Sequence, residues 1–242
     1  MGQTVLVTGS SGKIGRAVVV EMLRRGHAVR GLDRLPSPVL PDTRLVDLGD
    51  RPALDQAMVG VDCLVHLAAT PDDEDFLTRL LPNNLVGLFH VMEAARLAGV
   101  RRIVLASSGQ VNWWQQLGGD LPVYEHQPVS PRGWYAATKM FLEAAGRGYS
   151  EQFGISVIAT RLGWCPRPGQ EEEIRSLEWA HDVYLSPNDA GRFFACCVEA
   201  PASVKFLIVN GTSKPARETR LDMTVARTVL GYEPTEQWPQ GM

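Results

Sequence analysis

Three glycines spaced three residues apart constrain the fold of this chain more than any other feature. Gly9, Gly12 and Gly15 follow a short apolar run at residues 5–7 and open a helical pattern that ends at Gly26. Such a loop between a buried strand and a helix brings backbone N–H groups close to a pyrophosphate, and it lets the helix pack closely on the sheet. The pattern therefore predicts a dinucleotide-binding βαβ unit. We expect its cofactor contacts from Gly9, Ser11, Gly12, Lys13, Ile14 and Gly15.

Short apolar runs alternate with helical patterns over residues 4–162. This alternation predicts an α/β fold with a doubly wound parallel sheet, the Rossmann fold. Six runs are expected to be strands: residues 5–7, 27–33, 45–48, 62–69, 102–108 and 156–162. Beyond a turn-rich segment we expect a helix from Ser186 to about Ala200, a strand at residues 205–209 and a helix at 217–230. The chain would thus have an NAD(P)-binding domain, residues 1–162, and a small C-terminal substrate-binding part, residues 163–242, interleaved with the sheet.

Composition and charge exclude several classes of function. The net charge of −3 gives no electrostatic basis for binding nucleic acid or an anionic membrane surface. No apolar run is long enough to span a membrane, and the N-terminus lacks a signal-peptide pattern. The four cysteines have no metal-site spacing, and the apolar surroundings of three of them predict buried reduced thiols. We expect a cytoplasmic protein without a metal site.

Residues at the carboxyl ends of the expected strands indicate which dinucleotide binds. Asp33 ends the second strand, close to where a carboxylate accepts hydrogen bonds from the adenosine ribose. A carboxylate there repels a 2′-phosphate, which favours NAD, whereas the adjacent Arg34 could pair with that phosphate and permit NADP. The fourth strand ends in small side chains, which would let a cofactor lie against its tip. The further cofactor contacts expected here are Asp47, Leu48, Leu67, Ala68 and Ala69.

Tyr135 and Lys139 lie four residues apart at the start of an expected helix. This spacing puts both side chains on one helical face, so the phenol and the ammonium can point into one site. A nearby cation stabilises tyrosinate and lowers the pKa of the phenol, as proton transfer near neutral pH requires. The fifth strand ends in two hydroxyls, of which Ser108, or Ser107 if the register is shifted by one, would fix the reacting oxygen. His66, in the middle of an apolar strand, is expected to be structural.

Taken together, these residues resemble the extended short-chain dehydrogenase/reductase superfamily, the NAD-dependent epimerase/dehydratase family. The matching positions lie within about the first 165 residues and are Gly9, Gly12, Gly15, Asp33, Asp47, Leu48, Leu67, Ala68, Ala69, Asn84, Ser107, Ser108, Tyr135, Lys139 and Arg161. The resemblance implies hydride transfer at a carbon–oxygen bond, with Tyr135 as general base and Lys139 on the nicotinamide ribose. Asn84 would support a structural water or the geometry of Lys139, unless it is a helix-surface amide.

Within this family the chain is most similar to uronate dehydrogenases, NAD enzymes that oxidise the anomeric carbon of glucuronate or galacturonate. The likeness lies in residues 84–87, 103–108 and 161–166. Those enzymes hold the sugar carboxylate with hydroxyls and an arginine. Arg175 is the candidate here, although it could equally be a solvated helix charge.

The expected substrate pocket also departs from that likeness. Residues 70–74 and 171–173 are acidic and poorly suited to an anion, so a neutral sugar is an alternative substrate. Trp113 and Trp114, with Trp134 and Trp164, could form a flat platform for a sugar ring, or they could be ordinary packing. We expect substrate contacts from Thr70, Gln110, Trp113, Trp164 and Arg175.

Two other functions fit parts of the sequence. A nucleotide-sugar 4-epimerase uses the same tyrosine, lysine and serine and keeps its NAD, but such enzymes usually carry a longer C-terminal domain than residues 163–242. A non-enzymatic NAD(P)-sensing regulator would need the glycine loop but has no use for Tyr135 and Lys139.

Members of the family often pair through helices that flank the sheet. The resemblance therefore also implies a homodimer, through the helices before Tyr135 or after Pro187.

Overall fold

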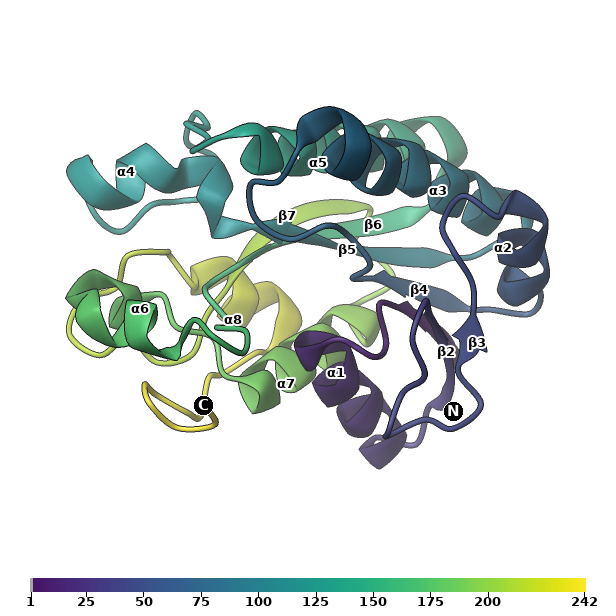
Figure 1. The fold of residues 1–242 in the computed structure, drawn as a ribbon, viewed down its shortest axis with the longest axis horizontal. Helices are drawn as coiled ribbons and strands as arrows, with labels where there is room; N and C mark the ends of the chain where they lie inside the picture. The colour runs from purple at the N-terminus through teal and green to yellow at the C-terminus, as the bar shows by residue number, and fades with distance from the viewer. Residues whose placement is uncertain (1) are drawn as a thin grey trace.

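A seven-stranded sheet with every strand parallel forms the centre of the protein, as a computed structural model describing residues 2–242 shows (Figure 1). The strands lie in the order β3-β2-β1-β4-β5-β6-β7. They are β1 (Thr4–Thr8), β2 (Ala28–Asp33), β3 (Arg44–Leu45), β4 (Cys63–His66), β5 (Arg102–Ser108), β6 (Ser156–Leu162) and β7 (Phe206–Gly211). The doubly wound parallel sheet predicted from the sequence is confirmed.

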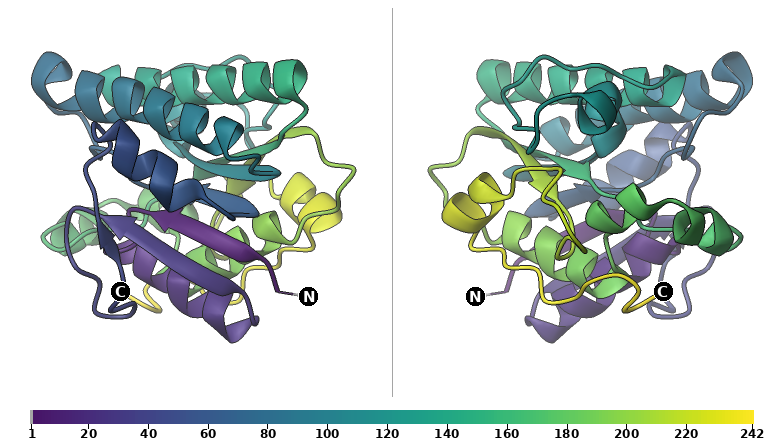
Figure 2. Two further views of the ribbon diagram at one scale, coloured as in Figure 1. Left: turned by 90° about the vertical axis from the view of Figure 1, so that its right-hand side faces the viewer. Right: turned by 90° about the vertical axis from the view of Figure 1, so that its left-hand side faces the viewer.

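Helices cover both faces of this sheet (Figures 1 and 2). The α-helices are α1 (Lys13–Arg24), α2 (Arg51–Met58), α3 (Gly87–Leu97), α4 (Trp113–Gly118), α5 (Trp134–Phe153), α6 (Glu171–Ser176), α7 (Pro187–Val198) and α8 (Thr224–Leu230). The others are the π-helix η1 (Phe76–Val86) and the 3-10 helices η2 (Gly109–Asn112) and η3 (Glu178–Asp182). One face carries α2, α3 and α5, and the other carries α1, α7 and α8. Within residues 2–242, none of the helices has the length and apolar character that crossing a membrane would take.

β1 shows why the central strands are apolar along their whole length. Val5 and Val7 pack with residues of α1 and α7, whereas Leu6 between them packs with residues of α2 and α3. All three side chains are fully buried. Successive side chains of a strand alternate between faces, so a sheet with helices on both sides needs apolar residues at nearly every position.

The order of the strands creates a crevice at the carboxyl ends of β1 and β4. The chain runs from β1 outward to β3 and then returns to β4, on the other side of β1. Open α/β sheets bind ligands at such a switch point. Thr8 of β1 lies in register with Leu32 of β2 and with His66 of β4, so the loops that follow these three strands meet there.

Three elements are clearly shorter than the sequence predicts, and the first is the fourth strand, which spans Cys63–His66 in place of residues 62–69. The third strand holds only Arg44 and Leu45, because its neighbour β2 ends at Asp33, which pairs with Leu45. The last helix begins at Thr224 instead of residue 217. Before it, Leu221 forms a β-bridge with Val123. The N–H of Val123 donates to the carbonyl oxygen of Arg220 (2.8 Å) and its carbonyl oxygen accepts from the N–H of Asp222 (2.9 Å), which keeps this backbone out of a helix.

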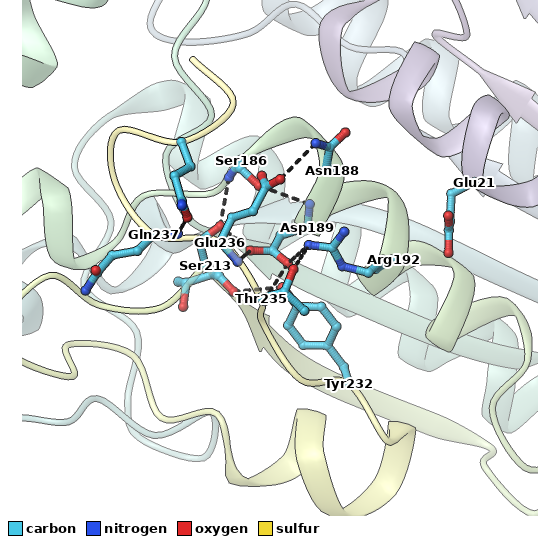
Figure 3. Close-up of polar contacts among 12 residues, drawn as sticks. Glu21, Ser186, Asn188, Asp189, Arg192, Ser213, Tyr232, Thr235, Glu236 and Gln237 are labelled. Atoms are coloured by element: carbon cyan, nitrogen blue, oxygen red, sulfur yellow. Dashed lines mark hydrogen bonds and ion pairs between the residues drawn. The ribbon is translucent and has the colours of Figure 1, made fainter.

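A buried carboxylate ties the C-terminal residues to α7 (Figure 3). Asp189 is fully buried and accepts hydrogen bonds from the Ser213 hydroxyl (2.7 Å) and from the backbone N–H groups of Thr235 and Glu236 (both 3.0 Å). Arg192, one turn further along α7, is its ion-pair partner. A carboxylate removed from water needs such partners to offset its lost hydration. The segment that follows β7 is thereby fixed against α7.

Candidate active site

A cavity of about 460 Å³ opens at the carboxyl ends of the central strands. It brings the residues predicted to bind the cofactor together with those predicted for catalysis. The predicted residues that line it are Gly9, Ser11, Gly12, Lys13, Ile14, Gly15, Asp33, Asp47, Leu48, Leu67, Ala68, Ala69, Ser107, Ser108, Gln110, Trp113, Tyr135, Lys139 and Trp164. The predicted residues outside its lining are Thr70, Asn84 and Arg175.

The glycine loop is packed against itself and against the loop that follows β4. A Cβ atom on Gly15 would lie 2.0 Å from the carbonyl oxygen of Gly9, and one on Gly9 would lie 2.8 Å from the backbone nitrogen of Ala68. Gly9 also has a φ of +71°, a left-handed conformation that favours glycine. No side chain caps the first turn of α1, which Gly12 precedes. Because this turn lines the cavity, its N–H groups are available to an anion there.

Asp33 is held in place at the end of β2 by backbone N–H groups. One carboxylate oxygen accepts a hydrogen bond from Ser11 (2.9 Å) and the other accepts one from Leu35 (3.0 Å). The neighbouring Arg34 turns toward Asp47, with 3.9 Å between Nη1 and Oδ2. Two carboxylates and one guanidinium therefore stand where the adenosine end of a dinucleotide is expected.

Tyr135 and Lys139 lie on the first turns of α5, on one face of the helix as their spacing predicts. The Asp73 carboxylate, in the loop after β4, accepts a hydrogen bond from the backbone N–H of Tyr135 (2.8 Å) and fixes the start of this helix. The buried ammonium of Lys139 donates to the carbonyl oxygen of Ala106 (2.8 Å) and lies 5.4 Å from the centre of the Tyr135 ring. The helix and β5 together hold the two side chains at the cavity.

Ser108, and not Ser107, lies beside Tyr135. The Ser107 hydroxyl donates to the buried Glu143 carboxylate (2.6 Å), which removes it from the cavity centre. The Ser108 hydroxyl interacts with the Tyr135 phenol and accepts a hydrogen bond from the backbone N–H of Gln110 (3.1 Å). Neighbouring residues of a strand point to opposite faces, so only one of the two serines can meet the phenol.

The surroundings of the Tyr135 phenol shift its pKa in opposite directions. Burial raises the pKa of Tyr135 above its usual value, and the Asp72 carboxylate raises it further. The Ser108 hydroxyl and the Arg167 guanidinium lower it. Burial lowers the pKa of Lys139 to about 8. Arg167, which the sequence did not single out, is thus a further cation that lowers the pKa of the phenol.

Thr70 and Asn84 are buried outside the cavity lining, which corrects the substrate contact expected from Thr70 and excludes a helix-surface amide at Asn84. The Asn84 side chain accepts a hydrogen bond from the backbone N–H of Thr70 (2.7 Å) and donates to its carbonyl oxygen (3.0 Å). It also donates to the hydroxyl of Thr138 on α5 (3.1 Å). Asn84 therefore links the loop after β4 to the helix that carries Tyr135. Thr70 supports the site from behind instead of facing a substrate.

His66 is buried in β4, outside the cavity lining. Its Nδ1 lies 2.8 Å from the hydroxyl oxygen of Thr8 on the neighbouring strand. Burial, followed by the charge of Lys139, lowers the pKa of His66 to about 3. A neutral imidazole with a partner inside the sheet fits the structural role expected for it.

Aromatic side chains line the cavity on the side of the C-terminal segment. Trp113 and Trp164 both face it. Trp179 packs on both of them, edge-on to Trp113 with 5.2 Å between ring centres and 6.3 Å from Trp164. The guanidinium of Arg132 lies 4.5 Å from the centre of the Trp113 ring and also lines the cavity. The two lining rings are therefore held by packing and still present a surface to the cavity.

Arg175 is exposed on α6 and outside the cavity lining, which corrects the substrate contact expected from it and fits the alternative of a solvated helix charge. This helix begins with three glutamates and buries only Ile174, so its charged residues face solvent. The arginine that the structure brings to the site is Arg167, in the loop between β6 and α6, where it pairs with Asp72. The sequence offered little signal for either residue. Arg167 lies between two prolines in a segment without periodicity, and Asp72 lies in a run of acidic residues.

Comparisons with known proteins agree with this geometry. Residues 5–173 match the NAD dependent epimerase/dehydratase family. An L-arabinose 1-dehydrogenase (NAD(P)(+)) of Haloferax volcanii is 31% identical to this chain over 96% of each protein. A uronate dehydrogenase of Agrobacterium fabrum is 32% identical over 75% of this chain and 69% of that enzyme.

A solved structure extends the similarity to the fold. A mutant of uronate dehydrogenase from Agrobacterium tumefaciens, complexed with NAD, has a TM-score of 0.80 at 26% identity and covers 98% of this chain and 86% of its own. The family match spans well over half of the chain, and the resemblance drawn from the motifs is confirmed. This chain belongs to the NAD dependent epimerase/dehydratase family.

Proposed function

We propose that this protein is an NAD-dependent dehydrogenase that removes a hydride from the carbon of a C–OH group in a sugar or sugar acid. The observation that supports this most is one continuous cavity, which joins the glycine loop and Asp33 to Tyr135, Lys139 and Ser108. The similarity to L-arabinose 1-dehydrogenase and to uronate dehydrogenases points to the same class of substrate.

The residues of the cavity fit a dinucleotide. The backbone is closely packed at Gly9 and Gly15, and no side chain caps the first turn of α1. The N–H groups of this loop and turn can therefore donate hydrogen bonds to a pyrophosphate. Asp33 is placed to accept hydrogen bonds from ribose hydroxyls, and its charge would repel a 2′-phosphate. This supports NAD over NADP. Arg34 keeps NADP as the alternative, because a 2′-phosphate could compete with Asp47 for its guanidinium.

The side chains around Tyr135 can carry out the proton transfer. The Ser108 hydroxyl fixes the reacting oxygen, and Tyr135 takes the proton from the substrate hydroxyl. Lys139 binds ribose hydroxyls, and its ammonium stabilises the tyrosinate that this role requires. NAD, when bound, supplies the hydride acceptor.

Residues 163–242 contribute to both parts of the proposed enzyme. β7 extends the sheet beside β6, and α7 packs on the face that α1 covers. Trp164, Arg167 and Gln170 line the cavity from the loop between β6 and α6. This supports the division into NAD-binding residues 1–162 and a substrate-binding part, residues 163–242, interleaved with the sheet.

The cysteines support a reducing, cytoplasmic setting. All four are free thiols, and Cys63 and Cys197 are fully buried. Burial raises the pKa of Cys63 to about 12, which keeps its thiol protonated and unreactive.

We also infer that two copies of the chain associate through α3 and α5. These helices lie side by side on one face of the sheet (Figure 1), joined by a hydrogen bond from the Tyr149 phenol to the Glu93 carboxylate (2.6 Å). Their outer side exposes Phe89 and Phe141 by 55% and 46%. The alternative helix, α7, is largely buried in its own chain. A two-fold axis would pair this apolar surface with its own copy.

A substrate screen tests the proposed activity. Purified protein with NAD or NADP is offered L-arabinose and other free neutral aldoses, free uronates, and UDP-sugars, and the absorbance of the reduced cofactor is followed. Reduction of NAD by a free sugar or sugar acid supports the proposal. Interconversion of UDP-sugars without net reduction would identify a 4-epimerase instead. Cofactor binding without turnover of any of these compounds would favour a non-enzymatic NAD(P)-sensing role.

A further inference from the structure

We propose that Asp72 and Arg167 form a selectivity pair at the reacting centre, through which the enzyme takes neutral sugars and rejects sugar acids. The inference rests on the proposed sugar dehydrogenase activity and names the substrate class of the same site.

Asp72 has an unusual backbone conformation, and its side chain points toward Arg167. Its φ is 60°, and within residues 2–242 no other residue except glycine has a positive φ. The left-handed region costs energy for most side chains but is tolerated by Asp and Asn. One carboxylate oxygen accepts hydrogen bonds from Arg167 and from Gln170 (3.3 Å), and the other accepts one from Gln110 (3.5 Å). Three donors from two segments therefore converge on this carboxylate.

Arg167 is fixed from its own loop. Its backbone N–H donates to the side-chain oxygen of Gln170 (3.0 Å), the same residue whose amide nitrogen binds Asp72. The carbonyl oxygen of the preceding Pro166 accepts a hydrogen bond from the ammonium of Lys13 at the start of α1 (2.7 Å). The loop is thus anchored on both sides of the cavity, which distinguishes the pair from an ion pair of two mobile surface side chains.

The pair lies near Tyr135, because Asp73, the residue after Asp72, accepts a hydrogen bond from the backbone N–H of Tyr135 (2.8 Å). Asp72, Arg167, Gln110 and Gln170 line the same cavity as Tyr135. Asp72 and Arg167 both act on the charge state of that phenol, in opposite directions. A sugar whose hydroxyl is fixed at Tyr135 would therefore place further substituents against the pair.

Charge balance at the pair favours a neutral ligand. Sugar hydroxyls can donate to the Asp72 carboxylate and accept from Arg167 or Gln110, so neither charge is left unpaired. A sugar carboxylate attracted to Arg167 would lie against Asp72, since that carboxylate already occupies the guanidinium. Selectivity then comes from repulsion of the wrong ligand as much as from attraction of the right one.

Asp72→Asn separates the two classes of ligand. Asn tolerates the left-handed backbone and keeps the shape of the side chain, while it removes the negative charge beside Arg167. The probes are D-galactose and D-galacturonate, which differ only at C6, with NAD as cofactor. We expect the wild-type kcat/KM to be higher for galactose. In the variant, the ratio of kcat/KM for galacturonate to that for galactose should rise about tenfold, a modest value because the pair is only half-buried.

Two further variants serve as controls. Glu74→Gln removes the same charge from the same loop, but Glu74 is exposed and outside the cavity lining, so the ratio should stay at its wild-type value. Adding Arg167→Gln to Asp72→Asn removes the cation that would hold the sugar carboxylate, so the gain for galacturonate should disappear. An equal gain in Glu74→Gln would overturn the proposal, because it would reflect overall charge.

The outcomes separate this inference from the proposed activity. Absence of cofactor reduction with all free sugars and sugar acids contradicts the proposed activity itself. Oxidation of galactose with an unchanged ratio in Asp72→Asn, or a wild-type preference for galacturonate, overturns the selectivity pair alone. If Asp72→Asn is inactive, calorimetric titration with galacturonate in the presence of NAD replaces turnover. Tighter binding than to wild type is then expected, and equal binding overturns the inference.

Discussion

The phenol of Tyr135 lies among groups that act on its charge from several segments of the chain. Burial disfavours the tyrosinate most, and the carboxylates of Asp72 and Asp73 add to this effect. Ser108 and Arg167 favour it. The balance keeps the phenol protonated at neutral pH in this structure. Proton transfer from a substrate hydroxyl would therefore depend on how readily Tyr135 ionises, which makes this residue the first target for mutation.

Replacing Tyr135 by Phe should remove the general base and keep the ring in place. General acid–base catalysis contributes about 10²–10⁴-fold in rate, so we expect kcat to fall by about 10³-fold with the oxidised sugar. Steady-state reduction of NAD measures the loss, and circular dichroism confirms that the fold is kept. Tyr124→Phe is the matched control, because Tyr124 is exposed and outside the cavity. A Tyr135→Phe enzyme that keeps wild-type turnover would show that another group takes the proton.

The pH dependence of oxidation should show the raised pKa of Tyr135. The base works only when deprotonated, so kcat/KM should increase as the pH rises through the alkaline range. Asp72→Asn removes a group that raises this pKa and should move the alkaline limb to lower pH, whereas Arg167→Gln should move it to higher pH. Profiles of kcat/KM against pH for the three proteins test the sign of both shifts. Identical profiles would mean that neither charge reaches the phenol in the working enzyme.

How far single residues could be predicted from the sequence depended on whether local spacing determines their position. Tyr135 and Lys139 share a helical face because helices have a fixed period. Asp33 lies beside the glycine loop because both belong to one βαβ unit, in which the end of the second strand is next to that loop. Arg167 and Asp72 meet through two loops that are far apart in the chain and have no period. Their contact depends on backbone paths that local rules do not specify.

At the scale of elements, the β1–α1 loop links sequence to cofactor binding most directly. Gly15→Ala would place a Cβ atom 2.0 Å from the carbonyl oxygen of Gly9, so the loop or the helix must move. Overpacking of this kind typically costs about 1–3 kcal/mol. We expect a lower unfolding temperature and a loss of NAD affinity of about tenfold, since the N–H donors are displaced. Thermal unfolding and calorimetric titration with NAD measure the two effects.

Gly118→Ala provides the comparison for that variant. Gly118 ends α4, and a Cβ atom added there meets no other atom within 4 Å. Its effect on stability should stay below about 1 kcal/mol, and NAD affinity should not change. If Gly15→Ala behaves in the same way, the close packing of the glycine loop does not control cofactor binding.

The elements themselves were largely predictable, and each exception has an identifiable cause. β5 and β6 have the predicted bounds, because apolar, β-branched runs between turn residues are a strong signal for buried strands. The last helix was predicted too long, since the β-bridge between Leu221 and Val123 is a tertiary contact. η1 contains Pro82 and adopts π-helical geometry, which a helical period of 3.6 residues does not reveal.

For the whole molecule, the alternation of strands and helices in the sequence predicted the sheet and both of its helical layers. It did not predict the surface through which two copies of the chain would associate. Each face of the sheet is covered, and the order of the strands places the carboxyl ends of β1 and β4 together as the fold class requires. Association depends on which outer side chains stay apolar. On α3 and α5 several charged side chains form ion pairs within the chain. Glu93 pairs with Arg96 on α3 (2.9 Å), and Arg147 pairs with Glu151 on α5 (3.5 Å).

A charge placed on this surface tests the proposed homodimer, in which α3 and α5 of two copies are in contact. Phe141→Glu on α5 introduces a charge that a two-fold interface would place against its own copy, so the dimer should dissociate. Sedimentation equilibrium should give about twice the monomer mass for wild type and a mass near that of the monomer for the variant. Val20→Glu is the matched control, because Val20 is similarly exposed (51%) but lies on α1, across the sheet. A monomeric wild type, or equal dissociation by both variants, would exclude α3 and α5 as the interface.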